Sequence, residues 1–183
     1  MAKICTPVEI LDFWLVECGR QAWFRSSPVL DAEISGRFRD THLTLAGGAV
    51  EDWRGSPDER LAAIIVLDQF QRNIYRATPL AFATDGLALR EAELAIAAGA
   101  DRATDVAHRC FFYMPFEHSE ALADQQRSVE LFDDLGDEEY ADYARRHHAV
   151  IAQYGRFPHR NVLLGRASTE AELAYLGQPG SGF

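Results

Sequence analysis

The 183-residue sequence predicts an all-α fold. Helix start and stop signals recur along the chain, and no run alternates apolar and polar residues between paired turn dipeptides, as strands do. With 48% apolar and 25% charged residues, the composition is that of a globular protein rather than a disordered or disulfide-dense one. The length suffices for a sizeable core. We therefore expect a single helical domain over residues 1–183.

The first two helices are expected near the N-terminus. Thr6, Pro7 and Glu9 supply a capping residue, a proline at the first position and an early acid for a helix that continues to Gly19. A second helix is expected from about residue 30 to residue 46, where two glycines end it. Each places a stripe of apolar side chains on one face.

The third helix carries the strongest start signal in the chain. Ser56, Pro57 and Glu59 form a capping box with a proline in the first turn, ahead of LAAIIVLDQFQRNIY at 61–75. Apolar residues surround most of this helix, which is typical of a helix buried by neighbours on several sides. We expect it to be central, so its polar residues need partners.

The remaining helices follow from caps and glycine stops, and the short loops between them favour antiparallel pairs, either as a bundle or as a stacked array. The expected elements are a helix capped by Asp85 and ending at Gly99, one capped by Ser119 and ending at Gly136, one over 138–154, one started by Thr169 and Glu172 and ending near Gly177, and a loose tail over 177–183.

Charge and cysteine content exclude several protein classes. The net charge of −10 argues against general attraction to nucleic acid or an anionic membrane. Three cysteines without CxxC spacing indicate a reducing compartment, the cytoplasm, and Cys5 and Cys18 would stand about 20 Å apart on one helix, too far for a disulfide. Glu9 and Asp12 interrupt any signal peptide, and the longest aliphatic run, 61–67, is too short to span a bilayer.

Three segments resemble a known bacterial family. They are LDQFQRNIYR at 67–76 with AFATD at 81–85, FFYMPFEHSE at 111–120, and YGRFPHRNVLLGRAST at 154–169. The set is similar to the family of domain of unknown function 924 (DUF924) over nearly the whole chain, with Gln71 standing where the family usually has proline. The resemblance implies a soluble bacterial protein with a tetratricopeptide-like α-α superhelix of antiparallel helix pairs, and no established biochemical function.

A basic segment from Arg145 to Arg166 holds five arginines, three histidines and no acid. Residues 145–148 are predicted to face solvent or to pair with the acidic segment 130–142.

In GRFPHRN at 155–161, Gly155 ends a helix, and His159, Arg160 and Asn161 are expected to begin a short one whose amides favour an anion. The guanidinium forks of Arg156 and Arg160 suit carboxylate or phosphate. Alternatively, Arg160 pairs with Glu117 or Asp68 and locks the fold.

Two further groups of residues point to a polar site. Asp68, Arg72 and Arg76 repeat at i, i+4 and i+8 on the central helix, where they form either an internal salt bridge or the lining of a cavity. The aromatic run 111–116, including Tyr113, precedes Glu117 and His118, which suggests a pocket wall ending in an acid–base pair. The same run is equally typical of a hydrophobic core in which Ser119 caps the next helix.

No cofactor or metal is expected. The six histidines lack HxH or HExxH spacing, and no motif supports a nucleophile at Ser119 or Cys110. Glycine-rich nucleotide-binding loops are also absent from the sequence.

The sequence therefore predicts that the three segments meet in one pocket that binds a small anionic molecule or an acidic peptide. An alternative is a hydrolase or lyase that acts on an anionic substrate, with Glu117 or His118 transferring protons. A third is a protein-interaction scaffold with an extended apolar groove. The oligomeric state stays open. The predicted ligand-binding residues are Asp68, Arg72, Arg76, Tyr113, Glu117, His118, Arg156, His159, Arg160 and Asn161.

Overall fold

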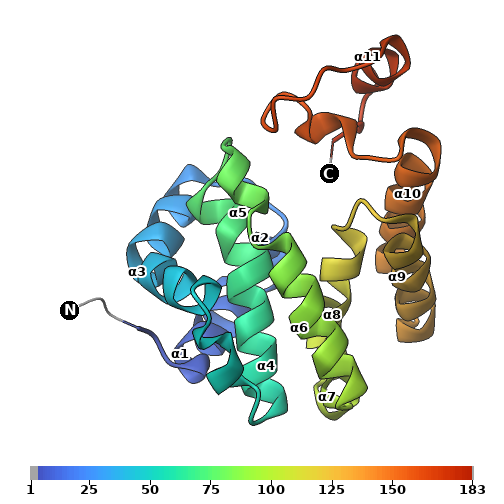
Figure 1. Cartoon of the computed structure of the whole chain (residues 1–183). Coiled ribbons are helices and arrows are strands. Elements are labelled where there is room, and N and C mark those ends of the chain that lie inside the picture. Colours follow the sequence, from blue (N-terminus) through green and yellow to red (C-terminus); the bar gives the residue numbers. More distant parts are fainter. Residues whose placement is uncertain (1–3, 183) are drawn as a thin grey trace. The chain divides into compact units, whose positions relative to one another are not determined.

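The structure is a computed structural model that describes residues 4–182, and these residues form helices, turns and loops without a strand (Figure 1). The all-α prediction is confirmed. The described residues fall into two compact units, 4–76 with 80–115 and 77–79 with 116–182. We describe each by itself. The single domain over 1–183 stays a prediction, and its ends, residues 1–3 and 183, lie outside the described residues.

The first unit begins with the predicted capped helix. In α1 (Pro7–Leu11) the hydroxyl of Thr6 accepts from the Glu9 amide, and Glu9 accepts from the Thr6 amide. A π-helical segment, Asp12–Cys18, continues α1 and ends at Gly19, whose φ of 65° suits glycine. The short helix α2 (Arg20–Trp23) follows.

The next helix, α3 (Pro28–Ala46), starts slightly earlier than predicted because Ser27 caps it and Pro28 occupies the first position. The 3-10 turn Ala49–Trp53 leads from α3 toward the central helix.

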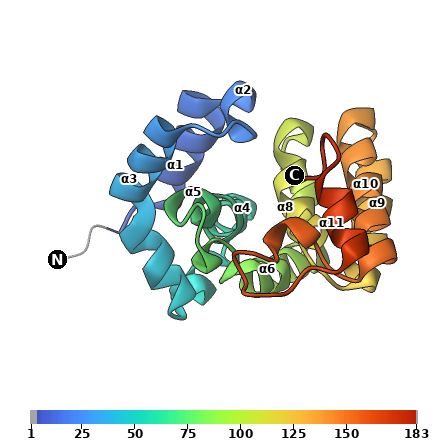
Figure 2. The same cartoon turned by 90° about the horizontal axis from the view of Figure 1, so that it is seen from above.

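The central helix is confirmed and consists of three consecutive parts. They are α4 (Pro57–Ile64), a π-helical segment (Ile65–Phe70) and α5 (Gln71–Ile74). Every residue of the π-helical segment is buried. Figure 2 shows α3 alongside α5, and Phe70 packs its ring against the rings of Trp14, Phe13 and Phe38. This aromatic core holds the polar residues of the central helix in place.

The last helices of the first unit correct two predictions. In α6 (Asp85–Ala97) the N-cap residue is Thr84, not Asp85, because the Asp85 carboxylate turns to Arg72 and Gln71 instead. After α7 (Ala100–Ala103), an unpredicted helix, α8 (Val106–Glu117), carries the aromatic run with Pro115 inside it. Because proline disfavours a helix interior, the sequence pattern did not indicate α8.

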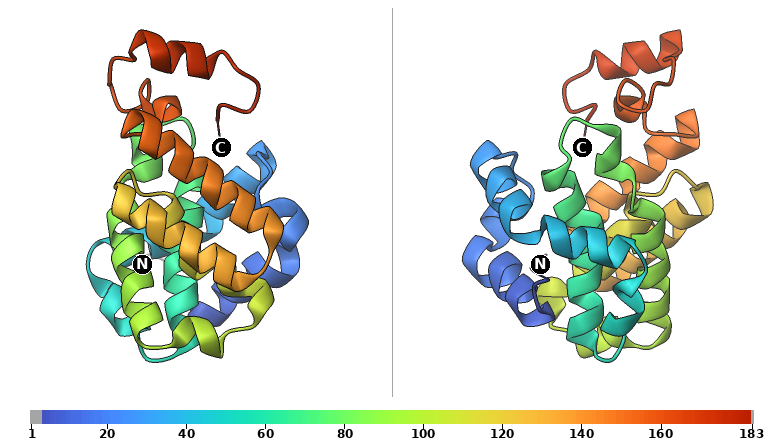
Figure 3. Two further views of the ribbon diagram at one scale, coloured as in Figure 1. Left: turned by 90° about the vertical axis from the view of Figure 1, so that its right-hand side faces the viewer. Right: turned by 60° about the vertical axis from the view of Figure 1, so that its left-hand side comes forward.

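The second unit is built on two adjacent helices, α9 (Leu122–Leu135) and α10 (Glu138–Tyr154), which Figure 3 shows side by side. The predicted bounds of α10 are confirmed. The prediction that Ser119 caps α9 is wrong: Ala121 is the N-cap, and the Ser119 hydroxyl shapes the preceding turn by accepting from the Ala121 amide and donating to Asp124.

A three-residue 3-10 turn, Pro158–Arg160, and the helix α11 (Glu170–Leu176) complete the second unit. The capping box of Thr169 and Glu172 is confirmed. The tetratricopeptide-like pairing of helices and the loose tail stay predictions.

Two further properties concern the chain as described. No helix within residues 4–182 has the length and apolarity that crossing a membrane requires. Among the described residues, none of the three cysteines, Cys5, Cys18 and Cys110, forms a disulfide.

Candidate functional site

The predicted site residues are divided between the two units. Asp68, Arg72, Arg76 and Tyr113 lie in the first, and the other six lie in the second. That all three segments form one pocket stays a prediction. Within the second unit, two of the segments do touch: the amide of Phe157 in GRFPHRN donates to Glu120 of FEHSE at 2.7 Å.

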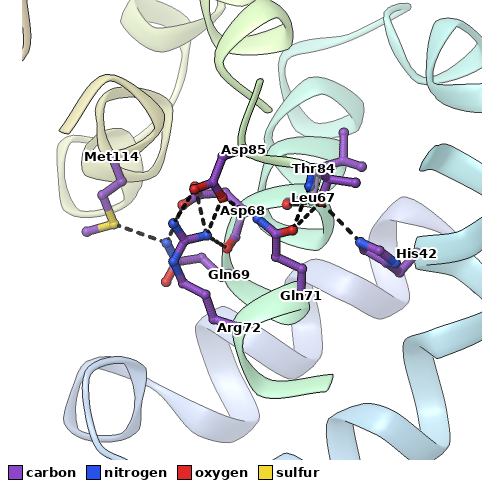
Figure 4. A network of polar contacts seen from close by, with 9 residues as sticks. All are labelled: His42, Leu67, Asp68, Gln69, Gln71, Arg72, Thr84, Asp85 and Met114. Atoms are coloured by element: carbon purple, nitrogen blue, oxygen red, sulfur yellow. Dashed lines mark hydrogen bonds and ion pairs between the residues drawn. The ribbon is translucent and has the colours of Figure 1, made fainter. Parts of the chain in front are cut away.

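In the first unit, Arg72 is held by two aspartates (Figure 4). Its Nη1 and Nη2 donate to the two oxygens of Asp85 at 2.9 and 3.2 Å, and Nη1 lies 3.4 Å from Asp68 Oδ1. Asp68 is 1% exposed, so this ion pair is largely shielded from water. The arrangement matches the internal salt bridge that the i, i+4 spacing indicates.

The π-helical segment explains why polar side chains gather at this point. A wider helical turn changes the partners of backbone carbonyls, and here Leu67 accepts from the Thr84 hydroxyl at 2.7 Å while Asp68 accepts from Arg72 at 2.5 Å through its carbonyl oxygen. Gln71 joins Thr84 to Asp85, since its carbonyl accepts from the Thr84 amide and its amide donates to the carboxylate. The network therefore completes the backbone hydrogen bonding of the central helix.

A buried histidine adjoins this network. His42 of α3 is 3% exposed, and its Nε2 lies 3.2 Å from the Thr84 hydroxyl. Burial lowers the pKa of His42 to about 4, so the ring is neutral at pH 7.

The other two predicted residues of the first unit have partners elsewhere in that unit. Arg76 donates to the carboxylate of Asp31 in α3 at 2.5 and 2.8 Å, and Asn73 donates to the same carboxylate. The hydroxyl of Tyr113 donates to Asp101 at 2.9 Å. Burial, followed by Asp101, raises the pKa of Tyr113, so the phenol stays protonated. Both contacts are consistent with structural roles.

In the second unit, three basic side chains of the described residues contact the ring of one phenylalanine. Phe157 is fully buried. The ring centres of His147 and His159 lie 5.6 and 5.5 Å from the centre of the Phe157 ring, and the guanidinium carbon of Arg160 lies 4.5 Å from the same point. Arg160 and His147 are themselves buried. We call Phe157, His147, His159 and Arg160 the Phe157 cluster.

The backbone of this segment is fixed by an ion pair that the sequence did not identify as part of a site. Glu120 accepts from Arg166 at 2.6 and 3.0 Å, and Arg166 also donates to the carbonyl of Phe157 and the side chain of Asn161. Burial opposes ionisation of Glu120, but hydrogen bonds from Arg166 and the Phe157 amide outweigh it and lower the pKa of Glu120. Only the presence of both residues in the family-like segments hinted at this pair.

The anion site expected at the amides of His159, Arg160 and Asn161 stays a prediction. Residues 158–160 form only one 3-10 turn, with Asn161 as its last cap, and the preceding amide of Phe157 already binds the Glu120 carboxylate. The chain itself therefore supplies the anion at that amide.

The sequence suggested an acid–base pair of Glu117 with its neighbour His118, and the structure places Glu117 against His147. Its Oε1 lies 2.8 Å from Nδ1 of His147, one helix away, and both side chains are buried. His147 was expected on an exposed face, but it lies on the buried stripe of α10 with Ala144 and Ile151.

Arg145 does pair with Asp133 and Glu138 of the acidic segment, as predicted.

Arg156 lies beside an open hollow of about 520 Å³. It donates to both carboxylate oxygens of Glu172, at 2.6 and 2.8 Å, and to the carbonyl of Ala167. The hydrogen bonds from Arg156 are the main reason that the pKa of Glu172 falls to about 2. Within the described part of the chain, no group of three His, Cys, Asp or Glu residues is arranged to hold a metal ion.

Comparison with known proteins adds family membership and fold. A family model described as "Bacterial protein of unknown function (DUF924)" matches residues 10–180. A solved structure, that of the protein of unknown function ATU0120 from Agrobacterium tumefaciens, is 39% identical with a TM-score of 0.90, covering 93% of this chain and 96% of that one. Among curated proteins, none matches this chain.

Proposed function

The chain belongs to the DUF924 family of bacterial proteins of unknown function, and from that premise we propose that it binds a small anionic molecule, a carboxylate or a phosphate, at the Phe157 cluster. The carboxylate end of an acidic peptide presents the same chemistry. The proposal concerns the second unit and uses Arg160, His159 and His147.

One observation carries the proposal: Arg160 and two histidines gather on a single buried ring in a protein whose net charge is −10. The planar guanidinium suits bidentate contact with an oxyanion, and His159 offers a ring nitrogen as a further hydrogen-bond donor.

The surrounding residues support a preformed site. Glu120 and Arg166 hold the backbone of Phe157 on both its amide and its carbonyl, and Arg166 orients Asn161 next to Arg160. A site whose side chains are positioned in advance binds more tightly, because less conformational entropy is lost on binding.

Thermal unfolding with a panel of anions tests the proposal. Sulfate, phosphate, acetate and succinate are compared, and an anion present at about 100 times its Kd should stabilise the protein by about 2.7 kcal/mol, which raises Tm by about 5–10 °C. Arg160→Met should abolish this shift, and Arg160→Lys should keep part of it. Arg127→Met is the matched control, because Arg127 pairs only with exposed Glu130 in the contacts described. Unchanged Tm with every anion would reject the proposal.

The contact between Glu117 and His147 favours a second candidate, a hydrolase or lyase that acts on the bound anion. A carboxylate on Nδ1 holds the imidazole in the tautomer whose Nε2 carries the lone pair, as a general base requires. Glu117→Gln should then abolish turnover of carboxylate or phosphate esters, followed by NMR, while leaving anion binding intact. Turnover that survives in Glu117→Gln would remove this candidate.

A cytoplasmic location, argued from three cysteines that form no disulfide, and a tetratricopeptide-like helix arrangement belong to the same proposal. Fractionation of the native host tests the former, and an experimental structure of the whole chain tests the latter.

A further inference from the structure

His159 stands in an unusual position for a titratable group. It is the middle residue of the 3-10 turn, its ring packs on Phe157 at 5.5 Å, and the next residue places a guanidinium on that same ring. The pKa of a histidine held beside a fixed positive charge shifts when another charge offsets that positive charge. An anion bound at Arg160 would do so.

We infer that anion binding at the Phe157 cluster is coupled to the uptake of one proton by His159. The inference rests on the proposed function and states how that site is regulated. It makes affinity depend on pH even for a ligand whose own charge is constant.

The groups facing His159 determine its state before binding. Burial comes first, then the positive charge of Arg160 from the same turn and the imidazole of His147 from α10, with Arg166 from the following loop acting in the same direction. Glu120, from the turn before α9, acts in the opposite direction. Together they lower the pKa of His159 to about 4, so the ring is neutral at pH 5.5 and above.

An anion on Arg160 reverses the balance. Its negative charge offsets the repulsion from the guanidinium and attracts a proton to the neighbouring imidazole, which then donates to the anion from a charged N–H. The pKa of His159 therefore rises on binding, toward or above the ordinary value of a histidine. Glu117 remains on His147, which leaves His159 as the group that responds most directly.

Linkage fixes the sign of the effect. A group that gains a proton on binding strengthens binding as the pH falls, by up to about tenfold per pH unit between its free and bound pKa values. We expect the association constant to be about tenfold or more higher at pH 5.5 than at pH 7.5.

The experiment is calorimetric titration with sulfate and, separately, trifluoroacetate. Both probes keep a constant charge from pH 5.5 to 7.5, so any proton taken up is bound by the protein. At pH 5.5, two amine buffers with different heats of ionisation should give different binding heats, whose difference corresponds to an uptake of about 0.5 to 1 proton per anion.

Two variants identify the residue. His159→Gln should bind with a heat that is independent of the buffer and with an affinity that changes less than about threefold between the two pH values. His148→Gln, a partly exposed histidine on α10, is the matched control and should behave like the wild type.

The outcomes separate the two claims. Anion binding with no proton uptake in the wild type would overturn this inference and leave the proposed function standing. Uptake that persists unchanged in His159→Gln would also overturn it. If neither probe binds at either pH, the proposed function itself fails, and the inference fails with it.

Discussion

The Arg72 network of the first unit and the Phe157 cluster of the second each contain an arginine, and the groups that the structure shows beside the two guanidinium groups differ. Arg72 is surrounded by oxygen atoms of its own unit, from Asp68 and Asp85. The guanidinium of Arg160 lies on the face of an aromatic ring that it shares with two histidines. Burial alone therefore does not reveal the role of an arginine; the chemistry of its neighbours does.

The two regions also contain histidines with similar pKa values that have different causes. Burial alone lowers the pKa of His42 to about 4, whereas burial together with Arg160 and His147 lowers the pKa of His159 to about 4. Only the second cause can be altered by a bound anion. An anion bound at Arg160 should therefore raise the pKa of His159 and leave the pKa of His42 unchanged.

The largest effect is expected from Arg72→Met, which leaves the buried carboxylate of Asp68 beside Asp85 without this guanidinium. The free energy of unfolding should fall by about 3–5 kcal/mol, measured by urea denaturation at pH 7. Arg76→Met is the matched control in the turn just after α5, and it should cost less than about 1 kcal/mol because Arg76 is 42% exposed. Similar losses in both variants would refute the structural role of the Arg72 network.

The second prediction concerns acid. His42 binds its proton more weakly in the folded state, with a pKa of about 4, than in the unfolded chain, so its contribution to stability is present above about pH 6.5 and is lost as the pH falls toward 4. At pH 4.5 the loss should be about 2–3 kcal/mol relative to pH 7. His42→Gln should remove that part of the pH dependence in urea denaturation.

The same measurement in sulfate sharpens the contrast between the regions. Saturating sulfate should suppress the acid-dependent contribution of His159, judged by comparison with His159→Gln, and leave that of His42 unchanged. Equal suppression of both contributions would contradict the distinction drawn between their causes.

A smaller effect is expected from Glu120→Gln, which keeps a hydrogen-bond acceptor for Phe157 and removes the charge facing Arg166. Stability should fall by about 1–2 kcal/mol, because both side chains of the pair are mostly buried. Loss of a negative charge beside the Phe157 cluster should at the same time strengthen sulfate binding about two- to fivefold in calorimetry. Weaker sulfate binding in a folded variant would place the anion elsewhere.

The smallest effect is expected from Arg145→Ala on the outer face of α10. Arg145 is 42% exposed, and both of its acidic partners, Asp133 and Glu138, are more exposed still. The free energy of unfolding should change by no more than about 0.5 kcal/mol, with anion binding unaltered. A larger change would show that the basic segment acts as a whole rather than through the Phe157 cluster.

Helix boundaries set by local contacts were predictable from the sequence. Thr6, Thr169 and Gly155 act within four residues of their own positions, through caps or a left-handed stop, so no knowledge of distant segments is needed. Where a long-range partner competes, the prediction was wrong. The carboxylate of Asp85 turns to Arg72, thirteen residues away, instead of capping α6.

The sequence by itself determined the all-α class, the central buried helix and the residue types of the candidate site. Helical periodicity, capping and segregation of charge depend on residues close together in the sequence and can therefore be recognised from it. Only the tertiary structure decided which of those residues meet. Glu117 faces His147 rather than its neighbour in sequence, and Glu120 meets Arg166 across 46 positions. The physical reason is that a charge in the interior takes the partner that packing brings within hydrogen-bond distance, and sequence spacing carries no record of that distance.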